Sequence, residues 1–179
     1  DRAFMPTDGY VSAFTQALPV YADTPYVKNT YAFGAFRSIN ENIVGAFKFY
    51  ASAVNGIDDD VRISKRNFVS SGRLRGFKAV GPKDNNDYVG GNYVAAMNFE
   101  TNLPTLLPES TKTDVGLFLD FGNVWGVDYD SQIDDSNKIR SSAGTVINWT
   151  SPLGPMSFTL AKDITKATTD KTETFNFRL

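Results

Sequence analysis

The sequence predicts an all-β fold, an antiparallel transmembrane β-barrel to which this chain supplies about eight strands. Segments of up to about 15 residues alternate apolar and polar side chains with a period of two, and no segment has a helical period. Strands of ~9–11 residues or more suit a tilted membrane crossing, whereas strands of soluble proteins are nearer ~5–6 residues. From residue 38 onward, short connections alternate with longer polar ones, which is typical of outer-membrane barrels.

The composition agrees with a barrel but does not require one. Aromatic residues make up 13% of the 179 residues, and the mean hydropathy is −0.27. Barrel strands keep the mean hydropathy low because each strand has one polar face. An antiparallel meander in a soluble β-sandwich fits the same composition nearly as well, so it stays open as an alternative.

The charge and the missing residue types argue against several classes of function. A net charge of −2 provides no basic face, so no nucleic-acid partner is expected. The chain has no cysteine and no histidine, which removes disulfides, Ser-His triads and the usual zinc ligands. We therefore expect no catalytic residue, no metal site and no cofactor.

Three strands are expected before the long loop. Residues 9–18 and 26–38 have β composition, and the second of these segments contains Gly34. Residues 43–54 follow a tight turn at 39–42 and alternate more clearly. One face of that strand carries Ile43, Gly45, Phe47, Phe49, Ala51 and Ala53, and the other face carries Lys48, Tyr50 and Ser52.

Five strands are expected after a long polar loop at 55–87, namely 88–102, 112–125, 138–150, 156–164 and 172–179. Proline-containing turns at 103–111 and 151–155 and polar loops at 126–137 and 165–171 separate them. The apolar faces carry Tyr93, Ala95, Met97 and Phe99, then Leu117, Leu119 and Phe121, and at the end Phe175, Phe177 and Leu179. The opposite faces of the first two of these strands carry Asn98, Glu100, Phe118 and Asp120.

The loop 55–87 exceeds the ~12–15 residues usual for a connection without structure, so we expect it to be functional or disordered. It contains Leu74-Arg75-Gly76-Phe77, where loops usually carry small polar residues. Arginine stays charged, so a guanidinium held out of bulk water needs carboxylate partners. Glu100 and Asp120 are the candidates, because the alternation turns both toward the barrel interior from neighbouring strands.

Two arrangements fit these residues. In one, the loop folds into the barrel, Arg75 contacts both carboxylates, and Gly76 turns the backbone so that Phe77 packs against lumen residues such as Phe118. In the other, lumen water solvates the carboxylates and Arg75 lies on a mobile surface loop. The residue pattern alone leaves both open.

The motif Leu74-Arg75-Gly76-Phe77 in a long loop resembles the signature of the BamA-type outer-membrane assembly superfamily. The following segments resemble the same family in order and spacing, over roughly residues 42–179. These segments are Gly90-Gly91-Asn92, Phe99-Glu100, Phe118 to Trp125 with its GxVW ending, and Ser151 to Pro155.

The resemblance implies an integral outer-membrane protein of a Gram-negative bacterium that inserts β-barrel proteins without bond chemistry. Its implied partners are nascent outer-membrane proteins, accessory lipoproteins of an assembly complex, lipid and lipopolysaccharide. In the family, the loop arginine reaches acidic residues of the two following strands. The residues expected to form this lumen latch are Arg75, Gly76, Phe77, Glu100 and Asp120.

The same resemblance implies a seam where the first and last strands of a closed barrel meet. A client strand would add to the exposed edge there by main-chain pairing. Phe175, Phe177 and Leu179 are expected on this seam strand. The family's barrel has about sixteen strands, so we expect residues 1–179 to be the C-terminal part of one barrel domain. A TamA-like factor, a two-partner secretion transporter and a passive outer-membrane channel stay open as alternatives.

Charged segments of the loops have weaker interpretations. Asp58-Asp59-Asp60 and the acidic loop 126–137 suit divalent cations that bridge lipopolysaccharide, although calcium-loop spacing is missing. Arg62, Lys65 and Arg66 suit contact with lipid phosphates. Solvated external loops explain both sets better.

Overall fold

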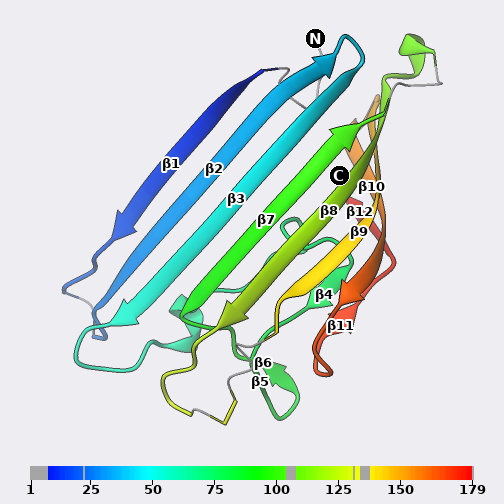
Figure 1. Ribbon diagram of the computed structural model, residues 1–179. Coiled ribbons are helices and arrows are strands. Elements are labelled where there is room, and N and C mark those ends of the chain that lie inside the picture. Colours follow the sequence, from blue (N-terminus) through cyan, green and yellow to red (C-terminus); the bar gives the residue numbers. More distant parts are fainter. Residues whose placement is uncertain (1–7, 22, 104–107, 131, 134–137, 179) are drawn as a thin grey trace.

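The computed structural model describes residues 8–21, 23–103, 108–130, 132–133 and 138–178. Eight strands form one sheet in the order β1-β2-β3-β7-β8-β9-β10-β12, and all neighbours are antiparallel (Figure 1). Their bounds are β1 Gly9–Ala17, β2 Tyr26–Asn40, β3 Ile43–Gly56, β7 Tyr93–Asn102, β8 Thr113–Trp125, β9 Arg140–Ser151, β10 Gly154–Thr165 and β12 Phe175–Arg178. The predicted all-β fold with eight antiparallel strands is confirmed.

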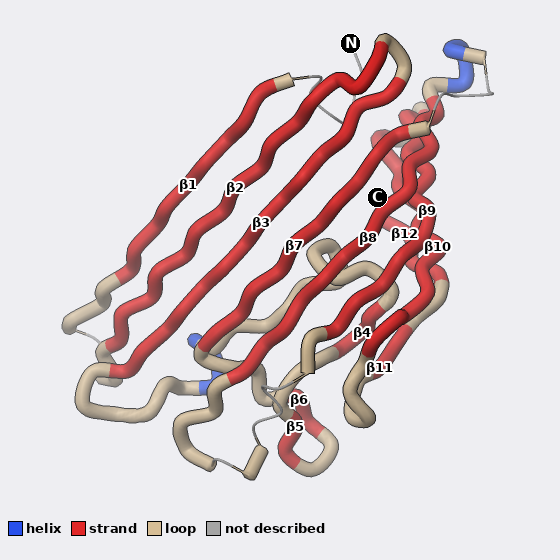
Figure 2. Tube along the Cα trace, in the orientation of Figure 1, coloured by secondary structure: helices blue, strands red, loops and turns tan. Residues whose placement is uncertain are grey.

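The sheet is curved, and the chain between β3 and β7 lies on its inner side (Figures 1 and 2). We call this stretch, residues 57–92, the motif loop. Register fixes which side chains face it: Lys48, Asn98 and Asp120 form one row across β3, β7 and β8. Since side chains alternate across a strand, the neighbouring row points to the other face of the sheet. The row with Asp120 faces inward, as the alternation in the sequence predicts.

The outer face carries the large apolar side chains. The rings of Phe33, Phe47, Phe99 and Phe121 follow one another across four strands, with centroids 6.3, 5.0 and 6.4 Å apart. Phe99 is 44% exposed although it lies in the middle of the sheet. An exposed apolar band opposite a polar interior is the pattern of a strand set that faces lipid.

Short turns at one end of the sheet are closed by local polar contacts. The Asn40 side chain accepts hydrogen bonds from the backbone N–H groups of Asn42 and Ile43, at 2.9 and 2.8 Å. Ser151 closes the β9–β10 turn in a similar way, because its hydroxyl donates to the Gly154 carbonyl at 2.8 Å. Asn and Ser favour such turns because their short polar side chains bond to nearby backbone.

The motif loop is structured. It contains a 3₁₀ turn at Ile63–Lys65 and three short strands, β4 Phe77–Ala79, β5 Lys83–Asp84 and β6 Asp87–Tyr88. Because β6 pairs with β5 in a small hairpin, the expected strand 88–102 begins only at Tyr93. No helix within the described residues is long and apolar enough to cross a membrane.

The expected strand 172–179 is wrong in its first part. β12 begins only at Phe175, and it pairs with Ser157–Leu160 of β10. Lys171 and Thr172 form a separate strand, β11 (Lys171–Thr172), which pairs with β4 in the motif loop. A buried ion pair at Asp170 holds this part of the chain away from the main sheet.

Candidate functional site at the motif loop

Arg75 connects the motif loop to two strands of the barrel wall. Its Nε and Nη2 donate to the two carboxylate oxygens of Asp120 on β8, each at 2.8 Å. Its Nη1 donates to Glu100 Oε2 on β7 at 2.6 Å. The structure therefore brings together the three charged residues that the sequence singles out. Two-pronged contacts of this kind are among the strongest charge-assisted hydrogen bonds.

The three charged side chains of this contact are shielded from water. The side chains of Asp120, Arg75 and Glu100 are 0%, 12% and 14% exposed. The Arg75 guanidinium also lies over the Phe118 ring, with Cζ 3.8 Å from the ring centroid. Burial by itself would lower the pKa of Arg75, but hydrogen bonds and charges of Asp120 and Glu100 outweigh it and raise the pKa. The guanidinium thus stays charged at every physiological pH.

The backbone of the motif also contacts the wall. The Arg75 N–H donates to Asp120 Oδ2 at 3.0 Å, and the Ser142 hydroxyl of β9 donates to the Arg75 carbonyl. Gly76 follows with φ of +88°, a conformation that a residue with a Cβ rarely adopts. A Cβ on Gly76 would lie 3.0 Å from the Cβ of Ala161 on β10. Glycine is needed here for both the turn and the close approach.

Phe77 is 2% exposed and packs in an apolar cluster on the inner face of the sheet. The cluster joins loop and wall and consists of Leu74, Phe77, Val80, Val94 and Val124. Phe118 belongs to a different cluster, so the expected packing of Phe77 on Phe118 is replaced by Arg75 on Phe118. The reason is register: Glu100 lies directly opposite Phe118, so the arginine that reaches Glu100 passes over that ring.

Two further contacts of the loop were not anticipated from the sequence. The Arg73 guanidinium stacks on the Tyr50 ring of β3, with Cζ 3.7 Å from the centroid. The Asn98 amide donates to the Arg73 carbonyl at 2.7 Å. Tyr50 and Asn98 lie on the polar faces that the alternation turns inward. An inward-facing Tyr or Asn on a strand beside the motif is therefore the sequence feature that predicts such contacts.

Arg66 is buried in a second ion pair, and this contradicts its interpretation as a lipid-phosphate contact. Its Nη2 donates to Asp128 Oδ1 at 2.7 Å, and its side chain is 3% exposed. Burial alone would raise the pKa of Asp128, but hydrogen bonds from the Val61 N–H and the Asn92 amide, with the charge of Arg66, lower it. The pair joins the start of the motif loop to the chain after β8.

Phe175 and Phe177, the residues expected at the seam, lie on the outer face of β12. Their register partners are Leu160 and Phe158, and the rings of Phe158 and Phe177 are 5.1 Å apart. Leu179, the third expected seam residue, lies outside the described residues. Residues 131 and 134–137 of the acidic loop lie outside them as well. Within the described part of the chain, no His, Cys, Asp or Glu residues are grouped to hold a metal ion.

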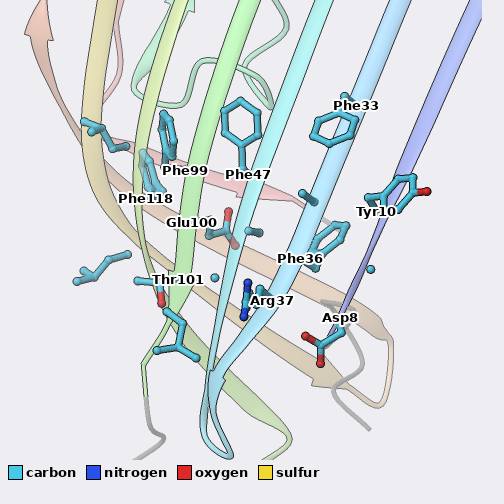
Figure 3. A pocket seen from close by; sticks show the side chains of 17 residues that line it. Asp8, Tyr10, Phe33, Phe36, Arg37, Phe47, Phe99, Glu100, Thr101 and Phe118 are labelled. Atoms are coloured by element: carbon cyan, nitrogen blue, oxygen red, sulfur yellow. The ribbon is translucent and has the colours of Figure 1, made fainter.

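A broad open cavity of about 1040 Å³ extends over β1, β2, β3, β7 and β8 and reaches Glu100 (Figure 3). Figure 3 shows Phe33, Phe47 and Phe99 on neighbouring strands and Arg37 nearer the β2–β3 turn. Its lining is mostly aromatic and aliphatic, with few polar groups converging on one point. Such a surface suits contact with lipid or apolar chain rather than a polar small molecule.

A family model described as the Omp85 superfamily domain matches residues 1–179. Two similar proteins are both named outer membrane protein assembly factor BamA. That of Neorickettsia risticii is 28% identical over 99% of this chain and 25% of its own length. That of Neisseria meningitidis serogroup B is 31% identical over 60% of this chain and 17% of its own length.

The fold matches a solved structure as well. The crystal structure of BamA from Haemophilus ducreyi lacking POTRA domains 1-3 superposes with a TM-score of 0.89 at 25% identity. The match covers 99% of this chain and 39% of that one, so the chain spans well under half the length of these relatives. The chain belongs to the Omp85 superfamily, and its curved sheet is part of an integral outer-membrane β-barrel.

Proposed function

We propose that the chain is the C-terminal part of the barrel of an outer-membrane protein assembly factor, with residues 1–179 in one barrel domain. The full protein binds nascent barrel proteins at the seam beside β12 and releases them into the membrane. The names of the similar proteins from Neorickettsia risticii and Neisseria meningitidis support this proposal.

Insertion of a client barrel requires no covalent bond to be made or broken. A client strand that adds to the edge of β12 satisfies its backbone hydrogen bonds, and its apolar face is buried in lipid. β12 is the last strand in the sheet order, and its pairing with β10 begins only at Phe175, so a client strand would add to the edge of this strand. Accessory lipoproteins, lipid and lipopolysaccharide are the further partners in this proposal.

Arg75, Gly76, Phe77, Glu100 and Asp120 form the lumen latch in this proposal. The observation that carries it is the contact of Arg75 with carboxylates on two strands, both largely shielded from water. The latch holds the motif loop against β7, β8 and β9, so it keeps the shape of the wall while the seam opens. A loop held in the lumen also limits leakage through the barrel.

The test is complementation of cells depleted of the native protein with full-length protein carrying Arg75→Ala. We expect the amount of folded client barrels in the outer membrane to fall about tenfold, while the variant itself is still inserted. Arg62→Ala is the matched control, because Arg62 is an exposed arginine of the same loop. Normal client levels with Arg75→Ala would contradict the latch.

A second measurement separates this proposal from a passive channel. Planar-bilayer conductance of the full-length protein is expected to be small and irregular, because the motif loop fills part of the lumen. Large steady currents in the unaltered protein, with no effect of depletion on client barrels, would favour the channel.

A further inference from the structure

The segment before the last strand, residues 166–174, is held on the inner side of the sheet by an ion pair with β9 and by pairing with the motif loop. We call it the approach segment. Asp170 receives Arg140 Nε at 2.9 Å and Nη2 at 3.1 Å, and both side chains are 0% exposed. Asp170 Oδ2 also accepts the Ala167 N–H at 2.7 Å, which closes a turn.

The motif loop binds the same segment from the other side. Lys171 and Thr172 are register partners of Ala79 and Phe77 in β4. The Glu173 N–H donates to the Gly76 carbonyl at 3.0 Å, and the Tyr88 hydroxyl donates to the Thr169 carbonyl. The approach segment is thus paired to the motif loop and not to β10.

The register of the last hairpin points to a second pairing for this segment. β10 and β12 pair from Ser157↔Arg178 to Leu160↔Phe175, and the Ala161 N–H still donates to the Thr174 carbonyl at 2.9 Å. Continued at the same register, Lys162 would lie opposite Glu173 and Asp163 opposite Thr172. Opposite charges at facing positions stabilise such a ladder. Lys166 to Thr169 would then form a short turn.

The edge of β10 that this ladder would use is in place. β10 continues to Thr165 and pairs with β9 on its other side as far as Ser141. Its pairing with β12 ends at Leu160. Lys171 and Thr172 are thus paired with β4, while the part of β10 beyond Ala161 offers a second edge at the register of the last hairpin.

We propose that Arg140 and Asp170 are positioning residues that select between these two pairings. With the ion pair intact, the approach segment stays on the motif loop and the last strand begins only at Phe175. When Arg140 releases Asp170, residues 171–173 pair with β10 and extend the last strand toward its outer end. Removing one partner of a buried ion pair leaves an uncompensated charge, so the choice responds strongly to either residue.

The consequence for assembly rests on the proposed function. The length of β12 sets how much edge a client strand meets, so the motif loop and Arg140 control the seam from inside the barrel. The conformational claim itself needs no client and is tested on the purified barrel.

Disulfide trapping in the full-length protein tests it, with any native cysteine outside these residues replaced, since the 179 residues contain none. The pair Ala79→Cys with Lys171→Cys reports the loop pairing, and Asp163→Cys with Thr172→Cys reports the extended hairpin. In the otherwise unaltered protein we expect the first pair to oxidise and the second to remain reduced. Adding Arg140→Gln is expected to shift the ratio of the two cross-links by about tenfold or more toward the hairpin.

Arg66→Gln is the matched control, since it removes a comparable buried ion pair elsewhere in the motif loop. It should leave the cross-link ratio unchanged. If Arg140→Gln prevents folding, Asp170→Asn, which keeps the side-chain shape, is expected to shift the ratio in the same direction.

An unchanged ratio in a folded Arg140 or Asp170 variant would overturn the inference. So would loss of both cross-links in a folded variant, because the released segment would then pair with neither the motif loop nor β10. Normal cross-link behaviour together with failed client assembly would instead count against the proposed function alone.

Discussion

Asp120 binds the side chain and the backbone N–H of Arg75 at the same time. The carboxylate therefore fixes the position of the loop chain as well as the direction of its guanidinium. Asp120 itself is anchored in the middle of β8, directly opposite Asn98 of β7. The motif loop is thus tied to the middle of the sheet.

Arg75→Ala is expected to lower the free energy of unfolding of the barrel by about 3–5 kcal/mol, because two largely buried carboxylates lose their partner. Arg75→Lys should fall between this variant and the unaltered protein, since an ammonium keeps the charge but not the planar fork. Urea unfolding of the full-length protein in detergent micelles, followed by tryptophan fluorescence, measures both. Equal stability of Arg75→Lys and the unaltered protein would show that charge alone is sufficient.

Asp120 and Glu100 are expected to contribute unequally to the free energy of unfolding. Asp120→Asn should cost more unfolding free energy than Glu100→Gln, because Asp120 is 0% exposed and accepts three hydrogen bonds from Arg75, whereas Glu100 accepts one. The same urea titration ranks the two variants. An equal or reversed order would contradict the geometry of the site.

Gly76→Ala is expected to destabilise the docked loop by about 1–3 kcal/mol through strain at positive φ and contact with Ala161. Gly154→Ala is the control, because Gly154 has φ of +126° with no atom near an added Cβ. Protease cleavage within the motif loop should therefore increase for Gly76→Ala and stay low for Gly154→Ala. Similar cleavage of the motif loop in both variants would show that Gly76 has no specific role in holding the loop against the sheet.

Acid is expected to loosen the junction between Val61 and Asp128. The pKa of Asp128 is lowered in the folded protein, so its stabilising contribution is complete above the ordinary value of about 4. The contribution is lost as the pH falls through the lowered pKa. Pepsin cleavage in residues 57–67 should rise in that range for the unaltered protein. Asp128→Asn should show cleavage that changes little with pH, and parallel curves would refute the assignment.

Much of the fold could be predicted from the sequence because alternation reports burial directly. The inward facing of Glu100 and Asp120 needed only the parity of β7 and β8, and the structure places both beside Arg75. The proximity of the loop to them came from the family resemblance, since a polar loop has no period that would show where it packs.

The misplaced parts depend on contacts between segments that are distant in sequence. Thr172 continues the alternation of the last strand, but the Arg140–Asp170 ion pair and β4 hold it away from β10. The segment around Arg66 has the composition of an exposed basic loop. Arg66 is buried only because it pairs with Asp128. The alternation of residues around Thr172 or Arg66 cannot show that β4 and Asp128 are their partners, because both partners lie far away in the sequence.

The docking of the motif loop through Arg75 and Asp120 is tested most directly by a double-mutant cycle on the unfolding free energy of the full-length barrel. The cycle compares Arg75→Ala, Asp120→Ala and the variant with both changes. A buried pair in direct contact predicts a coupling of about 2–3 kcal/mol, so the double variant should be little worse than either single one. Changes that add within about 0.5 kcal/mol would show two independent residues, and the loop would then not be held by this pair.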